Sequence, residues 1–559
     1  MTDDLKDKIT QAIKKSGFDL PECFDLTVPP EDFPYDYATN VAMVIAGTEK
    51  INPKTVAEKI VKNYSFDMTE KIEIAGGGFI NIKQKREYFL KKLAEILESG
   101  ENYGRSEVGK NKKVNIEFIS ANPTGPLHIG NARGGPIGEV ISNVLSWLGW
   151  KVEREFYLND TGNQILKFGQ TLAYWYILKN DSNFHFPEGG YPGDFLKTVS
   201  EEIQKEKKAE ISKLKDEELV EFFIRFGLEK TIRRIKEDII LLGINFDKWV
   251  YESDFLNSGK SFEVVEKLSA GGHTSKREGA LWFTSNDLDP NDRETVLLRS
   301  DADKTPTYFA TDVAYHKDKF DRASELLIDV WGATHHGHIA RVKSALKALS
   351  YNDGNLKVVL YQNVRLKKDG EVKLMGKRLG NYINIVDLLG KFKVSPDVFK
   401  YMIISQSPNS VIDFDLELAI EQSEKNPVYY LQYAYARICS ILQKADAKKI
   451  DELEKIARGE ASVDLADLAP LKDKKELDLI KVLTKFDDEL LMISGDFQIQ
   501  ALPHFATEVA SKYHDFYSTC QVLSEDRKLT TARLLLILAT RNVLKISLTL
   551  MGISAPEKM

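Results

Sequence analysis

Residues Asn115 to Asn131 read NIEFISANPTGPLHIGN, and this stretch decides the fold of the chain's middle part. The apolar run from Val114 to Ile119 predicts a short buried strand, and a turn rich in proline and glycine follows it. A strand, a tight turn and a helix in this order are typical of the start of a nucleotide-binding α/β sheet. The helix is predicted by apolar residues that recur on one helical face: Ile137, Val140, Ile141, Val144, Leu145 and Leu148.

The start of this predicted helix is suited to bind an anion. Unpaired backbone N–H groups and the positive end of the helix dipole favour a phosphate there. His128 adds a donor, and Gly130 leaves room for a nucleotide. A histidine beside a glycine is by itself a weak signal, because most such histidines pack locally.

A second segment, from Leu374 to Asn381, reads LMGKRLGN and predicts a basic, glycine-containing loop just after the last strand of the sheet. Standing alone it would be interpreted as a solvated surface turn. The two segments together resemble the paired HIGH and KMSKS signatures of class I aminoacyl-tRNA synthetases. Two positions depart from the signatures: Asn131 replaces the second histidine, and Leu374 replaces the first lysine, although Lys373 precedes it.

This resemblance implies an ATP site, with ATP bound as its Mg²⁺ complex. His128 and Asn131 would contact the phosphates, and Lys377 would neutralise charge as pyrophosphate departs. Such chemistry needs preorganised donors more than covalent help, because the transition state spreads charge over oxygen atoms. The ATP-binding residues implied are His128, Gly130, Asn131, Gly332, Met375 and Lys377.

Further segments resemble the arginyl-tRNA synthetase family in particular, and they span nearly the whole chain. Within the predicted catalytic part they are NIEFISAN (115–122), TPTYFATD (305–312) and GATHHGH (332–338). Elsewhere they are DYATN (36–40), GGFIN (77–81), NPVYYLQYAYAR (426–437) and GISAPEKM (552–559). Two departures are Thr334, where the family usually has Asp, and a lengthened segment 301–304.

An arginine pocket follows from this resemblance. A planar guanidinium needs acceptors in a fixed array and can stack on an aromatic ring, and Glu117, Asp312 and Tyr308 supply these groups. The resemblance also implies that Asn122 holds the amino or carboxylate end of arginine and that His336 lies nearby. Without the family context, the two carboxylates would be interpreted as strand-end or capping groups and the tyrosine as a core ring. A pocket of this kind discriminates without a large editing domain.

Contacts with RNA must be local, because the net charge of −7 gives no global sign of a nucleic-acid binder. The predicted helix 427–443 carries several tyrosines and Arg437, which suit the stacking of single-stranded bases. The resemblance implies that this region binds the anticodon loop, with Tyr433 and Arg437 as candidates. It implies that the N-terminal domain contacts the outer corner of the tRNA.

The fold class is therefore α/β: a Rossmann-type parallel-sheet catalytic domain, a small N-terminal α/β domain and a C-terminal all-α anticodon-binding domain. We expect boundaries at 1–108, 109–388 and 389–559, with a helical insertion at about 160–285. Predicted strands are Lys71 to Ala75 in the first domain, and Thr295 to Arg299, Glu325 to Val330 and Lys357 to Tyr361 in the central sheet.

The three cysteines lie far apart, so neither a disulfide framework nor a zinc site is predicted, and we expect no structural metal. No apolar run is long enough to span a membrane, and acidic residues in the first predicted helix argue against a presequence. We expect a cytoplasmic monomer.

The function that follows is ATP-dependent ligation of L-arginine to tRNA(Arg). Rivals are another class I synthetase, such as the cysteinyl or methionyl enzyme, whose zinc-type cysteine clusters are missing here. A catalytically silent RNA-binding paralogue is disfavoured by the presence of His128, Gly130 and Lys377. A dinucleotide-binding dehydrogenase lacks support, because no Gly-x-Gly-x-x-Gly fingerprint follows the first strand.

Overall fold

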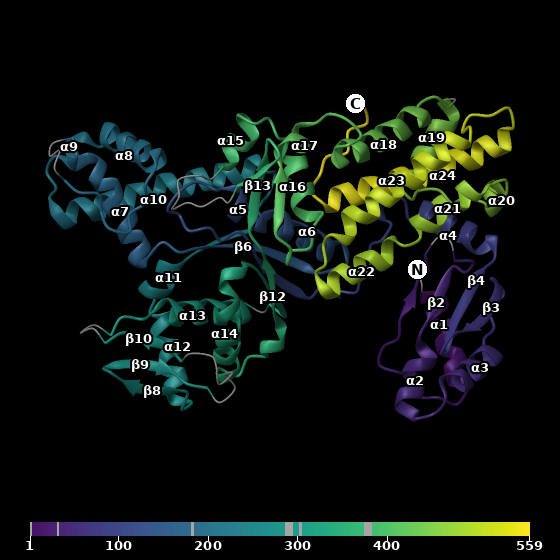
Figure 1. Cartoon of the computed structure of the whole chain (residues 1–559), viewed down its shortest axis with the longest axis horizontal. Coiled ribbons are helices and arrows are strands. Elements are labelled where there is room, and N and C mark those ends of the chain that lie inside the picture. The colour runs from purple at the N-terminus through teal and green to yellow at the C-terminus, as the bar shows by residue number, and fades with distance from the viewer. Residues whose placement is uncertain are drawn as a thin grey trace.

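The computed structural model describes residues 3–30, 33–179, 184–285, 294–300, 304–322, 324–373, 383–445 and 447–559. The molecule is elongated, with the N-terminal unit and a helical insertion at opposite ends and the catalytic sheet between them (Figure 1). No helix among the described residues is both long enough and apolar enough to cross a membrane.

The central sheet is five-stranded, parallel throughout, and ordered β12-β11-β5-β6-β7. Its chain order reverses between β5 and β11, so the crevice at their carboxyl ends is the place where a sheet of this kind binds ligands. The predicted strands at 114–119, 325–330 and 357–361 are confirmed. The strands are β5 (Lys113–Glu117), β6 (Lys151–Leu158), β7 (Lys248–Tyr251), β11 (Leu326–Gly332) and β12 (Leu356–Tyr361).

Helix α6 lies very close to β5 because glycines face the strand. A Cβ added at Gly138 would come within 2.2 Å of the Phe118 ring, and one at Gly134 within 3.1 Å of the Ile119 nitrogen. The predicted apolar face of this helix is buried. The helices of this unit are α5 (Ile129–Ala132), α6 (Gly134–Trp147), α13 (Tyr308–Asp321) and α14 (His336–Ala348), with 3₁₀ turns η2 (Ala333–His335) and η3 (Asp353–Asn355).

The predicted insertion is interrupted by a strand of the main sheet. β7 pairs in parallel with β6, so one continuous insertion from 160 to 285 is wrong. Charged helical sequence surrounds this four-residue strand and masks its signal. The helices before it form their own apolar core and are α7 (Gly162–Ile177), α8 (Asp194–Glu206), α9 (Lys208–Ile211) and α10 (Asp216–Leu241).

A small antiparallel sheet, β10-β9-β8, follows β7. It contains the predicted strand at 295–299, which we expected in the main sheet; this placement is wrong, because β10 pairs with β9. Alternating apolar residues identify a strand but not its neighbour. The elements are α11 (Glu252–Asn257), α12 (Lys260–Ala270), β8 (Thr274–Arg277), β9 (Ala280–Phe283) and β10 (Thr295–Leu298).

A three-stranded sheet, β14-β13-β15, follows β12, and we call it the stem sheet. β15 pairs in parallel with β13, so a purely helical region from 389 onward is wrong. The strands are β13 (Val364–Lys368), β14 (Glu371–Lys373) and β15 (Ile412–Asp415). The helices near them are α15 (Ile385–Gly390), α16 (Pro396–Ile404) and α17 (Leu416–Ile420).

The C-terminal helices share one hydrophobic core with the central sheet. The predicted helices at 427–443 and 531–551 are confirmed. Asn426 and Asp526 cap the starts of these two helices by accepting backbone N–H groups. The helices are α18 (Pro427–Leu442), α19 (Ala447–Ala457), α20 (Leu465–Leu468), α21 (Lys474–Leu483), α22 (Phe486–Asp496), α23 (Ala501–Thr519) and α24 (Arg527–Leu550).

The N-terminal unit packs helices on a four-stranded antiparallel sheet, and its predicted strand at 71–75 is confirmed. It joins the C-terminal helices through α4: the Arg86 guanidinium donates to the Ala469 carbonyl at 3.2 Å. The elements are α1 (Asp3–Lys15), β1 (Leu26–Thr27), β2 (Tyr37–Thr39), α2 (Val41–Glu49), α3 (Pro53–Asn63), β3 (Thr69–Ala75), β4 (Phe79–Gln84), α4 (Arg86–Ser99) and η1 (Gly100–Asn102).

Candidate active site

The chain leaves β5 through two consecutive residues in the left-handed region of backbone space. Ile119 has φ 65° and Ser120 has φ 38°. A β-branched residue with positive φ is strained, and such strain concentrates at functional sites. Residues 118–131, which follow β5 and include these two, form the signature turn at the carboxyl end of the central strand. The buried carboxylate of Asp238 on α10 accepts the Leu127 backbone N–H at 3.1 Å and so ties the helical insertion to this turn.

His128 and Asn131 cap helix α5 reciprocally. The Nδ1 atom of His128 accepts the Asn131 backbone N–H at 3.2 Å, and the Asn131 Oδ1 atom accepts the His128 backbone N–H at 2.9 Å. A Cβ at position 130 would come within 3.1 Å of the His128 ring, so glycine there leaves the ring in place. The Nε2 atom of His128 and the Nδ2 atom of Asn131 are not used by this capping box.

The second signature loop, with Met375 and Lys377, lies outside the described residues. The segment directly after it is joined to the signature turn. The Ile129 N–H donates to the Ile383 carbonyl at 3.1 Å, and the Ile385 N–H donates to the Leu127 carbonyl at 2.9 Å. His128 and Asn384 form the bridge between these two bonds. Lys377 is therefore six positions from a residue bonded to the turn.

Asp312 on α13 is a buried carboxylate held by two imidazoles. Its Oδ2 lies 2.5 Å from the Nε2 of His338, and its Oδ1 lies 3.3 Å from the Nδ1 of His316. Burial alone would raise the pKa of Asp312, but the two histidines hold it far below its ordinary value. Asp312 is thus ionised at neutral pH.

Glu117, at the end of β5, is buried and forms an ion pair with Lys319. The Lys319 ammonium is 2.6 Å from Glu117 Oε2 and 2.8 Å from Asp329 Oδ1, and all three groups are buried. His316 Nε2 lies 2.8 Å from the other oxygen of Asp329. The pKa of Glu117 is raised because burial outweighs the opposing effect of the Lys319 ammonium. Glu117, His316 and Asp329 have metal-ligand geometry, but the Lys319 ammonium already neutralises their carboxylates, so they suit a metal cation poorly.

Two tyrosines and a further carboxylate surround Asp312. Tyr308, the first residue of α13, is 44% exposed and its ring lies 5.8 Å from that of His338. Tyr157 on β6 is buried, and its hydroxyl has no hydrogen-bond partner among the described residues. Glu252, 5% exposed at the start of α11, has a pKa raised to about 7, first by burial and then by Asp160 and Asp312.

Glu252, Tyr157 and His338 were not individually predicted from the sequence. His338 lies at the end of the segment 332–338, so its spacing from Gly332 could have suggested it. Glu252 follows β7, whose signal was missed, and no pattern in the sequence marks Tyr157.

The remaining predicted residues lie around the same edge of the sheet. Asn122 is half-buried, and its Nδ2 donates to Gln164 Oε1 on α7 at 2.9 Å. Gly332 ends β11 and so lies at the crevice between β11 and β5. His336 begins α14 and is exposed, whereas His338 contacts Asp312.

The predicted anticodon residues lie on α18, in the C-terminal helices. The half-buried Tyr433 stacks on Tyr429 with a ring separation of 6.4 Å and an angle of 7°. Arg437 is exposed, and its guanidinium donates to the Tyr517 hydroxyl at 2.9 Å. Tyr435 is buried and belongs to the core. Half-buried aromatic rings and an exposed cation thus lie on the same helix.

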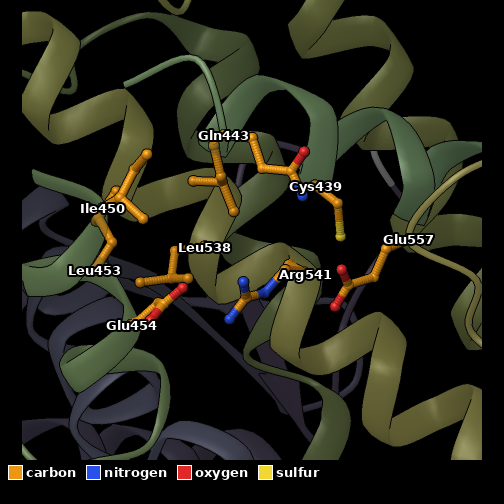
Figure 2. A pocket seen from close by; sticks show the side chains of 9 residues that line it. Cys439, Gln443, Ile450, Leu453, Glu454, Leu538, Arg541 and Glu557 are labelled. Carbon is orange, nitrogen blue, oxygen red and sulfur yellow. The ribbon is translucent and has the colours of Figure 1, made fainter. Parts of the chain in front are cut away.

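A cavity of about 100 Å³ opens beside these helices. Figure 2 shows Arg541 of α24 between Glu454 and Glu557, with the Cys439 sulfur directed toward the same space. Burial raises the pKa of the Cys439 thiol, which keeps it protonated. The lining belongs wholly to α18, α19, α24 and the C-terminal tail, so the cavity is separate from the catalytic sheet.

Comparison with known sequences matches the three structural units. Residues 3–83 match the arginyl tRNA synthetase N terminal domain, 92–397 the catalytic domain of tRNA synthetases class I (R), and 431–559 the DALR anticodon binding domain. The chain belongs to the arginyl-tRNA synthetase family. Relatives named arginine–tRNA ligase agree: that of Caldanaerobacter subterraneus subsp. tengcongensis is 40% identical over 100% of this chain and 98% of its own length. That of Ruminiclostridium cellulolyticum is also 40% identical, over 99% of this chain and 98% of its own length.

Solved structures of arginyl-tRNA synthetases have the same fold as this family member. A putative arginyl-tRNA synthetase from Campylobacter jejuni, 29% identical, superposes with a TM-score of 0.73 over 85% of this chain and 99% of its own. The arginyl-tRNA synthetase of Thermus thermophilus, 21% identical, gives a TM-score of 0.79 over all of both chains. The predicted fold class is confirmed: a parallel-sheet catalytic domain, an N-terminal domain and a C-terminal helical domain.

Proposed function

We propose that this chain ligates L-arginine to tRNA(Arg), with the chemistry at the crevice between β5 and β11. The arginine carboxylate attacks the α-phosphorus of Mg-ATP, and the bond to pyrophosphate breaks to give arginyl-adenylate. A terminal ribose hydroxyl of the tRNA, which loses its proton, then attacks the activated carbonyl and releases AMP. Positioning of the reactants carries most of both steps.

The observation that carries the arginine assignment is the buried, ionised carboxylate of Asp312 at the carboxyl end of the sheet. The deeper carboxylates of Glu117 and Asp329 are held by Lys319 and His316, whereas Asp312 lies beside the partly exposed Tyr308 ring. A carboxylate beside an aromatic ring suits the planar fork of a guanidinium.

Arginine then lies with its guanidinium against Asp312 and Tyr308 and with its amino or carboxylate end toward Asn122. Glu252 and the free hydroxyl of Tyr157 extend the set of polar groups that face the side chain. Glu117 lies deeper than Asp312, and one of its carboxylate oxygens already accepts a hydrogen bond from Lys319. His336, exposed at the start of α14, stands near the entrance.

ATP lies on the signature turn. His128, Gly130 and Asn131 meet the phosphates at the start of α5, Gly332 and Met375 border the nucleotide, and Lys377 neutralises the departing pyrophosphate. Support comes from the capping box, which fixes both side chains at the start of α5, where a phosphate would meet the helix end. Magnesium enters with ATP, and no zinc is required.

The tRNA crosses from the catalytic sheet to the C-terminal helices, where Tyr433 and Arg437 meet bases of the anticodon loop. The units 1–108, 109–388 and 389–559 divide tRNA contact, catalysis and anticodon binding. The protein acts as a monomer in the cytoplasm.

The test is aminoacylation of total tRNA with labelled amino acids one at a time, with and without ATP. Charging with arginine alone, dependent on ATP and lost in Lys377→Ala, is expected. Lys367→Ala, at a partly exposed lysine of β13 that pairs with Asp415, is the control and should keep the activity. Charging with another amino acid would overturn the arginine pocket, and no charging at all would overturn the enzyme.

A further inference from the structure

Arg133 is a fully buried arginine between α5 and α6, two positions after Asn131. Burying a charge is costly unless strong partners replace water. Among the described residues, no carboxylate forms an ion pair with Arg133. Its guanidinium instead donates to main-chain carbonyls: Gln362 at 2.6 Å, Ser410 at 2.8 Å, and Ser407 and Pro408 at 3.1 Å each.

These carbonyls belong to the two segments at the base of the stem sheet. Gln362 lies between β12 and β13, and residues 407–410 lie directly before β15. The two segments also bond to each other: the Gln362 N–H donates to the Pro408 carbonyl at 3.0 Å, and the Ile412 N–H donates to the Asn363 carbonyl at 3.2 Å. Arg133 thus joins the helix start after the signature turn to the origin of both strands.

The stem sheet directly precedes the segment that carries Lys377. β14 ends at Lys373, and the residues after that segment, Ile383 and Ile385, are bonded to Ile129 and Leu127 of the signature turn. The start of α5 and α6 is therefore bonded to the chain on both sides of the segment that carries Lys377: through the Arg133 fork at the base of the stem sheet and, after that segment, through the backbone pairs at Ile383 and Ile385.

We propose that Arg133 is a positioning residue that fixes the stem sheet, which directly precedes the segment with Lys377 in the chain, relative to His128. The inference rests on the proposed function for the role of Lys377. Only a planar guanidinium matches this array, because its donors point in fixed directions to several carbonyls at once. A lysine has a single charged point and cannot hold both segments in register.

The experiment compares Arg133→Lys with Arg365→Lys. Arg365 on β13 forms a bidentate pair with Asp413 on β15, at 2.6 and 2.9 Å, and is 40% exposed by side chain. It ties the stem sheet together but does not reach the signature turn. The rate of single-turnover adenylate formation with tRNA present should fall on the order of 100-fold in Arg133→Lys. A displacement of catalytic groups by about 1 Å has an effect of this size. The arginine KM and the Arg365→Lys rate should stay near wild type.

A double-mutant cycle with Lys377→Ala separates positioning from general destabilisation. If Arg133 acts through Lys377, Arg133→Lys should cost little further in the Lys377→Ala background. A full additional loss there, or a folded Arg133→Lys enzyme with a wild-type rate, would overturn the proposal.

Amide hydrogen exchange on the wild type decides the matter even if Arg133→Lys does not fold or the wild type does not charge arginine. The amides of Arg133, Gln362, Ser410 and Ile412 should open as one cooperative unit. Independent opening of the stem and the signature turn would overturn the positioning role, whereas failure of charging alone would overturn only the proposed function.

Discussion

The Lys319 ammonium lies 2.6 Å from the carboxylate of Glu117, although the two residues are 202 positions apart in the chain. Glu117, which the sequence presents as an acceptor for arginine, therefore has a cation partner before any substrate binds. The same ammonium contacts Asp329, so the charges beneath the crevice are largely balanced inside the protein. Asp312, held by imidazoles instead, keeps the negative charge that faces the crevice.

Lys319→Met should destabilise the fold strongly. It leaves the Glu117 and Asp329 carboxylates buried without their cation, which costs about 3–5 kcal/mol. Urea denaturation measures the free energy of unfolding. Lys367→Met is the control: the largely solvated Lys367 side chain pairs with Asp415 at 2.8 Å, and its loss should cost far less. Equal losses in both variants would contradict the buried cluster.

Asp312→Asn should impair arginine use specifically. The variant keeps the shape but removes the charge that pairs with the guanidinium, so kcat/KM for arginine should fall on the order of 100-fold or more. The KM for ATP should not change, because the phosphates lie on the signature turn. Asp413→Asn, at the exposed pair with Arg365, serves as the control in steady-state aminoacylation. An unchanged KM and kcat for arginine in Asp312→Asn would remove Asp312 from the pocket.

Arginine binding should strengthen as pH rises through about 7. Burial raises the pKa of Glu252 to about 7, so its carboxyl is neutral below this value and negative above it. A negative Glu252 favours the guanidinium, and the arginine KM should therefore decrease from pH 6 to pH 8. In Glu252→Gln this decrease should disappear. Its persistence would assign the pH dependence to another group.

Stability should fall at alkaline pH through His316. Burial lowers the pKa of His316, but Asp312 and Asp329 outweigh this and raise it to about 10. Because the folded pKa exceeds the unfolded value of about 6.5, the stabilisation is complete below pH 6.5 and is lost as pH rises through 10. Each unit of pKa difference is worth about 1.4 kcal/mol. Denaturation at several pH values should show a falling free energy of unfolding, and His316→Gln should flatten this slope.

Gly552→Ala should loosen the junction between the C-terminal tail and α6. Gly552 has φ 68°, and an added Cβ would lie 2.6 Å from the Glu139 carboxylate. Lys400 donates to that carboxylate and to the Gly552 carbonyl, at 3.0 and 2.9 Å. Gly17→Ala is the matched control, because Gly17 has φ 79° and nothing within 4 Å of the added Cβ. The control should lose about 1–2 kcal/mol of unfolding free energy, and Gly552→Ala more. Equal losses would mean that Glu139 yields freely.

Sequence patterns predicted the elements that have strong local signals. The strands at 114–119, 325–330 and 357–361 and the helices at 427–443 and 531–551 lie where periodicity predicts them, although the last helix begins earlier, at Arg527. The strands β7 and β15 were missed, since four-residue strands within charged or helical sequence carry little periodicity. The strand at 295–299 was predicted, but its neighbour was not, because pairing depends on where distant segments return.

The sequence by itself determined the family, the sheet that begins at Asn115, and which side chains could serve arginine and ATP. The tertiary structure decided that Lys319 neutralises Glu117, that imidazoles hold Asp312 ionised, and that Glu252 and Tyr157 face the same crevice. It also decided what Arg133 binds. The physical reason is that a buried charge is set by its nearest neighbours in space, and main-chain carbonyls, which every residue carries, leave no mark in the sequence.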